Sequence, residues 1–261
     1  MNASDITFER LAFAYLLLLF PLGVFFWYGI SLVNETLVSI VRMTAQLLFV
    51  GFYLHVVFQW NNPILNFLWI AVMVLVADAS IMNNCGLRMR RFALPLTVAL
   101  LSGILIPLLL FLFVVIRPAP VWDARFVIPI SGMILGNCLR ADILGVKGFY
   151  DGINKGEKIY LLALASGATR HEATLPFLRD ALETSLRPTL ATMATIGIVS
   201  LPGMMTGVIL GGANPMTAIK YQIAIMIAIF SGTAITVVVA ILLTMKSSFT
   251  SYGMLDKSIF R

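Results

Sequence analysis

The chain of 261 residues is 60% hydrophobic and only 11% charged, and its mean hydropathy is +0.96. These values are typical of integral membrane proteins and exclude an ordinary soluble globular domain. A formal net charge of +6 would suggest nucleic acid as the partner of a soluble protein, but here the basic residues gather between apolar stretches, so we expect a lipid bilayer and no nucleic acid.

Seven apolar stretches are long enough to cross a bilayer, whose hydrocarbon core of about 30 Å needs about 20 helical residues. The breaks between them carry turn residues, and Asn214 followed by Pro215 suits the N-cap and first position of the last helix. The sequence therefore predicts an all-α membrane protein, a polytopic helical bundle with about seven transmembrane helices. The predicted spans are 11–31, 36–59, 63–82, 92–116, 126–144, 189–211 and 217–244.

Basic residues indicate how these helices are oriented. They are concentrated after the third stretch, between the fifth and the sixth, and in the C-terminal tail, all on one side of the membrane. The positive-inside rule therefore predicts an outside N-terminus and a cytoplasmic C-terminus. We expect the membrane to be the inner (plasma) membrane of a bacterium. No segment outside the membrane is long enough for its own core, so we expect residues 1–261 to form a single transmembrane domain.

The longest stretch with polar residues, Glu157–Pro188, falls on the predicted cytoplasmic side. Its pattern predicts a helix, a turn at Gly167 and a second helix, within a cytoplasmic hairpin at 145–188. Thr169 and Glu172 have the spacing of a capping box, which begins the second helix.

Apolar positions recur after this turn at helical spacing, at Leu175, Leu178 and Leu182, so one face of the second helix is expected to be covered. A solvated loop that merely closes two spans is the alternative. We favour a role in docking a partner, carried by Ser166, Gly167, Ala168, Thr169, Glu172 and Leu175.

Polar residues inside predicted spans require an explanation, because a central Arg or Asp costs about 2.5–3.5 kcal/mol on insertion scales. Arg42 and Gln46 are four residues apart and share a helix face. They could line a translocation path with Asp78 and Asn137. The alternatives are snorkelling of Arg42 to the inner interface, an Arg42–Asp78 ion pair, and a bond from Asn137 to a neighbouring helix.

The sixth stretch carries a helix breaker, Pro202, in mid-membrane, followed by glycines at four-residue steps that permit close helix approach. Transporters place binding sites at discontinuous helices, so we favour a path-lining role over a merely kinked helix. Thioethers here could contact a soft metal, although methionine in apolar spans is usually filler. The predicted path comprises Arg42, Gln46, Asp78, Asn137, Ser200, Pro202, Gly203, Met204 and Met205.

Motifs for catalysis are missing. The sequence has no Gly-x4-Gly-Lys-Ser/Thr, hence no P-loop for nucleotide phosphates. His171-Glu172 begins like a His-Glu-x-x-His zinc site, but Leu175 occupies the second histidine position. We therefore expect no enzyme activity and no cofactor bound by this chain, and the pattern leaves metal ligands unassigned.

Two parts of the chain resemble known permeases. Gly167-Ala168-Thr169 and Leu186-Arg187-Pro188 are similar to the coupling loop of ABC-transporter permeases. The segments Gly197–Gly207 and Asn214–Ile223 resemble the FetB family of iron-export ABC permeases, which also includes plant aluminium-resistance half-transporter membrane subunits. Further resemblance lies in Val127–Met133 with Gly136-Asn137, and in Arg42 with Gln46.

This resemblance implies a homodimer of permeases with two separately encoded ABC ATPases, which bind ATP–Mg. It implies export of iron or another metal-related solute, driven through the hairpin around Gly167. As departures from the family pattern, Pro176 and the glycine-rich segment 145–156 are expected to loosen the helix that leads into the coupling region. The competing interpretation is a non-transport membrane scaffold or assembly protein, whose hairpin docks a different cytoplasmic partner.

Overall fold

The computed structural model describes residues 7–250, 253–256 and 258, and these residues form helices without any strand. Six helical segments are long and apolar enough to cross a membrane: Phe8–Trp27, Val33–Trp60, Pro63–Cys85, Arg91–Ile116, Ala124–Lys155 and Pro215–Ser248. The all-α polytopic fold is therefore confirmed. The elements in chain order are α1 (Phe8–Ala14), η1 (Tyr15–Leu18), α2 (Leu19–Trp27), α3 (Val33–Trp60), α4 (Pro63–Cys85), α5 (Met89–Leu110), η2 (Phe111–Ile116), α6 (Ala124–Lys155), α7 (Glu157–Ala165), α8 (Arg170–Thr195), α9 (Gly203–Leu210) and α10 (Pro215–Ser248).

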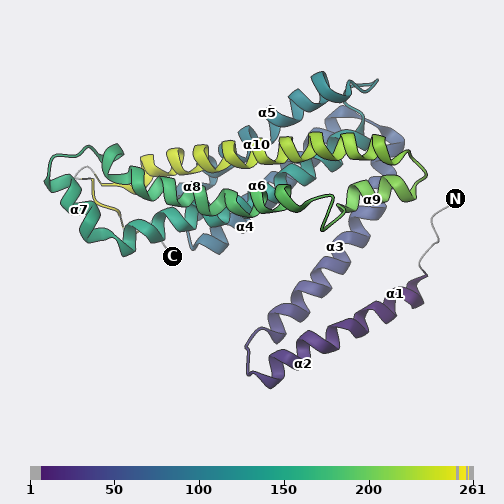
Figure 1. Ribbon diagram of the computed structural model, residues 1–261, viewed down its shortest axis with the longest axis horizontal. Helices are drawn as coiled ribbons and strands as arrows, with labels where there is room; N and C mark the ends of the chain where they lie inside the picture. The colour runs from purple at the N-terminus through teal and green to yellow at the C-terminus, as the bar shows by residue number, and fades with distance from the viewer. Residues whose placement is uncertain (1–6, 251–252, 257, 259–261) are drawn as a thin grey trace.

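The core is a bundle of α4, α5, α6, α8 and α10 that run side by side along the longest axis of the molecule (Figure 1). Its tightest crossing joins α5 to α10, where Gly103 and Gly232 bring the two backbones together. A Cβ added to Gly232 would lie 2.6 Å from the carbonyl oxygen of Gly103. Only glycine permits this approach, so these two residues determine how closely the central pair of helices packs.

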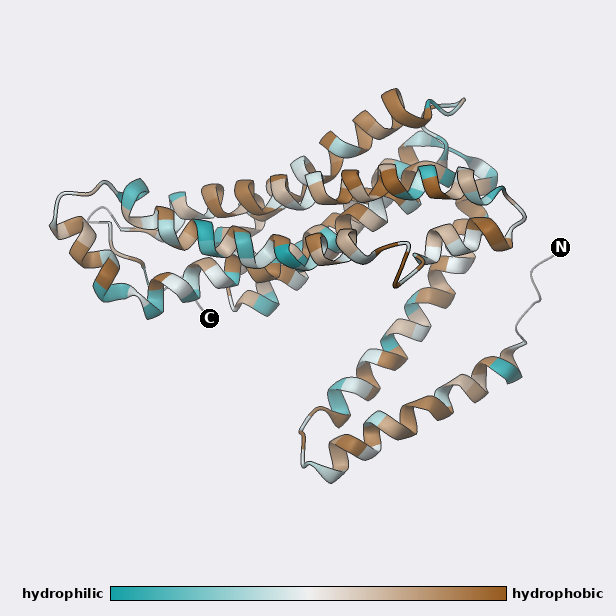
Figure 2. Ribbon diagram, in the orientation of Figure 1, coloured by the Kyte–Doolittle hydropathy of each residue, from teal (hydrophilic) through white to brown (hydrophobic). Residues whose placement is uncertain are grey.

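Helices α1, η1, α2 and most of α3 lie apart from the bundle (Figure 1). No residue of α1, η1 or α2 is buried, and Val57 near the end of α3 is the single buried residue of that helix. Figure 2 shows that α1 and α2 are largely hydrophobic over this exposed surface. The contact with the bundle is aromatic, since the rings of Tyr53 and Trp69 stack with centroids 4.0 Å apart.

The predicted N-cap of the last span is confirmed. The side chain of Asn214 accepts a hydrogen bond from the backbone N–H of Met216 at 2.8 Å, and Pro215 is the first residue of α10. The same device starts α4, where Asn62 caps and Pro63 follows. Such caps involve neighbours in sequence, so local chemistry is sufficient to place them.

The glycine-rich segment 145–156 does not loosen its helix, contrary to expectation. Helix α6 continues unbroken to Lys155, well beyond the predicted end of the span at 144. Its glycines serve close packing instead: a Cβ on Gly145 would lie 2.5 Å from Cγ1 of Val237, and one on Gly156 would lie 2.8 Å from Cε1 of Phe177. Helix α8 likewise continues through Pro176.

The predicted span 189–211 is not one helix. Helix α8 begins at Arg170 in the hairpin and ends at Thr195, a non-helical segment follows from 196 to 202, and α9 starts at Gly203. The discontinuity expected at Pro202 is present, but α8 has already ended at Thr195, and Pro202 is the N-cap of α9. The interruption is seven residues long rather than a kink. Hydrogen bonds support it locally, including one of 2.8 Å from the N–H of Gly197, at φ +90°, to the carbonyl of Ser200. We call residues 196–202 the helix break.

Candidate functional site

The hairpin turn lies at one end of the molecule, between α7 and α8 (Figure 1). Its backbone reverses at Gly167, whose φ of +93° favours glycine. The predicted capping box is present: the N–H of Glu172 donates to Thr169 Oγ1 at 3.3 Å, and the N–H of Thr169 donates to Glu172 Oε2 at 2.7 Å. Hydrogen bonds from Thr169 to the carboxylate lower the pKa of Glu172 below its usual range.

The tip of this turn is exposed. Ser166, Gly167 and Thr169 are exposed, and Ala168 is half-buried. The apolar stripe of α8 is covered by the chain itself, because Leu178 and Leu182 pack against the central core. Of the predicted docking residues, those available to a partner are therefore Ser166, Gly167, Thr169 and Glu172, with Leu175 half-buried beside them.

Helix α7 contacts the C-terminal tail through Tyr160, which is only 1% exposed. Its hydroxyl donates a hydrogen bond of 2.6 Å to the carbonyl of Gly253 in the C-terminal tail. Its ring lies 6.0 Å from that of Phe249, and the guanidinium of Arg170 lies over Phe249 at 5.8 Å. The tail therefore contacts both helices of the hairpin.

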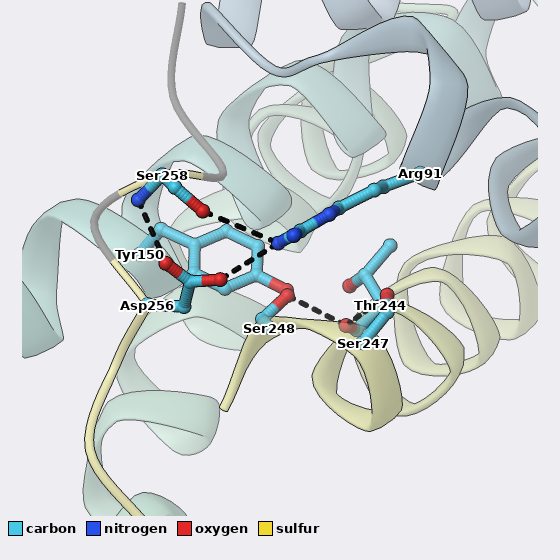
Figure 3. A network of polar contacts seen from close by, with 7 residues as sticks. All are labelled: Arg91, Tyr150, Thr244, Ser247, Ser248, Asp256 and Ser258. Atoms are coloured by element: carbon cyan, nitrogen blue, oxygen red, sulfur yellow. Dashed lines mark hydrogen bonds and ion pairs between the residues drawn. The ribbon is translucent and has the colours of Figure 1, made fainter. Parts of the chain in front are cut away.

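The same tail is joined to α5. Arg91 Nη1 lies 2.7 Å from Asp256 Oδ2 (Figure 3). The N–H of Asp256 donates a hydrogen bond of 2.9 Å to the carbonyl of Ser248. Close by, the hydroxyls of Tyr150 and Ser248 share a hydrogen bond of 2.6 Å. We call these contacts, together with the hydrogen bond from Tyr160 to Gly253, the tail clamp. It links the start of α5, the ends of α6 and α10, and the hairpin.

The helix break is flanked by two cavities. One, of about 490 Å³, lies between the break, α9 and α10, and the other, of about 380 Å³, lies between α6, α8, the break and α10. Gln222 on α10 lines both cavities. Its side chain is buried, with 8% exposed, and its Oε1 accepts no hydrogen bond from any described residue.

Several residues of the predicted path meet at this break. The 380 Å³ cavity is lined in part by Asn137, Ser200, Pro202, Gly203 and Met204, and the 490 Å³ cavity by Pro202 and Met205. The Asn137 amide donates 2.8 Å to the carbonyl of Met133 in its own helix. The structure thus brings together residues from α6, the break and α9 that the sequence placed in separate spans.

Arg42, Gln46 and Asp78 are placed elsewhere. Arg42 and Gln46 are exposed on α3, and Gln46 lines a third cavity of about 510 Å³ between α3, α4 and α6. The suggested Arg42–Asp78 ion pair is absent between these two described residues. Asp78 instead accepts a hydrogen bond of 2.8 Å from Thr97 Oγ1 on α5.

Sequence reasoning missed several buried polar residues, among them Gln222 and Asp142. Gln222 lies within the family-like segment Asn214–Ile223, and an amide inside an apolar span could have signalled it. Asp142, at 0% exposed, accepts a hydrogen bond of 2.8 Å from Thr236 Oγ1 on α10, and its other oxygen has no partner among the described residues. It lies in the last turn of the predicted span 126–144.

The side chains that line the two cavities are uncharged, and some of them carry thioethers, which are soft metal ligands. Among the residues that the structure describes, no three His, Cys, Asp or Glu side chains come together as metal ligands. Thioethers of Met193 and Met205 line the larger cavity, and that of Met204 the smaller. This arrangement can hold a solute by shape and hydrogen bonds rather than by ion pairing.

Comparison with known proteins identifies the family to which the chain belongs. Residues 8–249 match the family described as "Uncharacterised protein family (UPF0014)". The chain is 31% identical over 230 residues to UPF0014 membrane protein YjkA of Bacillus subtilis, which covers 86% of this chain and 88% of that protein. No solved structure matches the chain significantly.

Two further relatives carry informative names. The chain is 33% identical over 235 residues to Protein ALUMINUM SENSITIVE 3 of Arabidopsis thaliana, covering 89% of this chain and 84% of the relative. It is 29% identical over 254 residues to the probable iron export permease protein FetB of Escherichia coli, covering 96% of this chain and 95% of the relative. Each similarity extends over most of this chain and most of the relative.

Proposed function

Because the chain belongs to the UPF0014 family, whose members include a probable iron export permease, we propose that it is the transmembrane subunit of an ATP-driven ABC transporter. The near full-length similarity to that relative supports a permease role for the whole membrane domain. ATP–Mg would be bound by a separate ABC ATPase, since the sequence contains no P-loop.

One observation carries the coupling part of this proposal: α8 is continuous from the hairpin turn to the helix break. A helix of 26 residues is about 39 Å long, and α8 is continuous over this length although Pro176 and Pro188 lie within it. Displacement of its first turn, at Thr169, would therefore reach Thr195, where the helix ends beside both cavities. This geometry suits a coupling helix that converts ATPase motion into rearrangement of a path.

The hairpin also suits a protein partner chemically. Hydrophilic residues gather along α8 and where α6 leads into α7 (Figure 2), and the turn itself protrudes from the end of the bundle (Figure 1). The density of basic residues supports a cytoplasmic position for this end, where an ATPase would have access to ATP. The C-terminus would share that side, with the N-terminus outside the inner membrane.

The assembly and the cargo complete the proposal. Two copies of the chain would pair, each with one ATPase, as in ABC permeases that this chain resembles. The solute would be iron or another metal-related compound moved outward, which rests on the printed name of the Escherichia coli relative.

Co-reconstitution with the partner ATPase tests the coupling. Gly167→Trp is the obvious change, but its φ of +93° would strain any side chain. Ser166 is exposed at an ordinary φ of −82°, so Ser166→Trp blocks the turn without backbone strain. We expect this variant to lose most of the ATPase stimulation by the permease in proteoliposomes.

Ser31→Trp is the matched control, because Ser31 is exposed in the α2–α3 connection on the same predicted side. It should stimulate ATPase activity as the unmodified chain does. Normal stimulation by Ser166→Trp would show that the hairpin does not couple the two subunits. Failure of any ABC ATPase to co-purify with the chain would refute the transporter assignment itself.

A further inference from the structure

Gln222 lines both of the cavities that flank the helix break. Its amide oxygen is buried and accepts no hydrogen bond from the residues that the structure describes. A buried acceptor without a donor is costly, and native proteins rarely tolerate one unless a ligand or water completes it. The missing partner must be a group that donates a hydrogen bond.

The other polar side chains that line the cavities are also uncharged. They are neutral hydroxyls and amides from three elements: Asn137 on α6, Thr189 and Thr192 on α8, and Ser200 in the break. None of the described residues that line either cavity is charged. The rest of the surface is aliphatic or thioether, which adapts to irregular shapes.

This lining is unsuitable for a bare divalent ion. Removing such an ion from water is expensive unless carboxylate or imidazole ligands replace the water, and neither lines these cavities. The volumes of about 490 and 380 Å³ also suit an organic molecule, since ligand pockets usually measure about 300–1,000 Å³.

We infer that the cavities flanking the helix break form a binding site for an uncharged, hydrogen-bond-donating solute, with the Gln222 amide oxygen as its acceptor. This inference rests on the proposed permease function and narrows its cargo. Iron would enter the site inside a neutral chelate, not as a free ion. Because α8 ends at this site, movement of the hairpin would change the shape of the cavities.

The test measures binding to the full chain in lipid nanodiscs, without ATPase. Radioactive iron is offered by equilibrium dialysis in two forms, as ferrous ion kept reduced by ascorbate and as ferric tris-acetohydroxamate, an uncharged complex with N–H groups on its surface. We expect saturable binding of the chelate and none of the ferrous ion. Gln222→Leu, which keeps the shape but removes the acceptor, should weaken chelate binding by about tenfold.

Gln59→Leu is the matched control, because Gln59 is exposed on α3 and lies outside both cavities. It should leave the dissociation constant unchanged. A second variant, Gln222→Glu, keeps an acceptor oxygen at this position and should bind the chelate more tightly than Gln222→Leu does. Monodisperse elution on size exclusion verifies that each variant is folded.

The contrary results are distinct. Ferrous ion binding to the unmodified chain, or chelate binding that Gln222→Leu leaves intact, would overturn the site and its solute class. Failure of the chelate to bind the unmodified chain would do the same. Failure of the binding site can be distinguished from failure of the coupling. Ser166→Trp should bind the chelate normally even where it no longer stimulates the ATPase.

Discussion

Arg91 at the start of α5 and Asp256 in the C-terminal tail form an ion pair, with Nη1 and Oδ2 2.7 Å apart, across 165 residues of sequence. Through the tail clamp this pair joins the membrane bundle to the hairpin that we propose as the coupling element. Both side chains are partly exposed, at 45% and 30%, so the pair orders the tail rather than stabilising the fold.

Removing this pair should release the tail. For Arg91→Gln we expect faster hydrogen exchange of the tail backbone, with little change in thermal stability, because exposed ion pairs contribute little to the free energy of unfolding. Hydrogen–deuterium exchange with mass spectrometry measures both. Arg125→Gln, an exposed arginine at the start of α6, should leave exchange unchanged.

The clamp should also respond to acid in a defined range. Hydrogen bonds from Ser258 and Arg91 lower the pKa of Asp256 from 3.8 to about 2. A carboxyl with a depressed pKa stabilises the folded state above its ordinary pKa, and this contribution is lost as pH falls toward the lower value. Protection of the tail should therefore be constant from about pH 8 to about pH 5 and fall below about pH 4. A decline near neutrality would indicate that another group controls the tail.

The contact of Tyr160 with Gly253 should contribute measurably to stability. Tyr160→Phe keeps the ring but removes the donor of a 2.6 Å hydrogen bond in a buried position. We expect a loss of about 1 kcal/mol in the free energy of unfolding, measured by denaturant titration in detergent. Tyr28→Phe, at a residue that is 75% exposed, should change nothing. Equal stability of both variants would contradict the proposed anchoring of α7.

The crossing of α5 and α10 should not accept even a methyl group. In Gly232→Ala the new Cβ would lie 2.6 Å from the Gly103 carbonyl oxygen and 2.9 Å from Cγ2 of Ile134. Because backbone cannot move aside as a flexible side chain can, we expect a destabilisation of about 1–3 kcal/mol and a lower melting temperature. Gly136→Ala is the control, since no atom lies within 4 Å of its added Cβ, and it should be neutral or stabilising.

The capping box should determine how well the first turn of α8 is formed. Thr169→Ala removes the side-chain oxygen that accepts from the N–H of Glu172, and should cost about 1 kcal/mol of stability. If the turn transmits movement, ATPase stimulation should fall as well. Thr184→Ala, at an exposed position within the same helix, is the matched control and should affect neither quantity.

Much of the fold was accessible from the sequence because it depends on neighbours along the chain. Apolar stretches of sufficient length predicted the membrane helices, and six of them are present as continuous helical segments. The caps at Asn214 and Thr169 were correct, since each satisfies a backbone N–H two or three residues away. Pro202 correctly marked a discontinuity in the sixth stretch, although it is the N-cap of α9 and not the end of α8.

The site was only partly accessible, because its members meet through packing. Nothing in the order of residues shows that Asp78 bonds Thr97 rather than Arg42, or that Asp142 bonds Thr236. The glycines before the hairpin were expected to loosen the helix, yet α6 is continuous to Lys155, and Val237 and Phe177 pack where side chains at Gly145 and Gly156 would lie.

By itself, the sequence determined that this protein is a helical membrane protein with a capped hairpin on its basic side. These properties follow from hydrophobicity, charge and short-range hydrogen bonds. The tertiary structure decided that one helix connects that hairpin to a break, that two cavities flank the break, and that Gln222 lies between them with an unpaired oxygen. Those relationships depend on which helix faces meet, and helix faces are selected by close packing between residues distant in the chain.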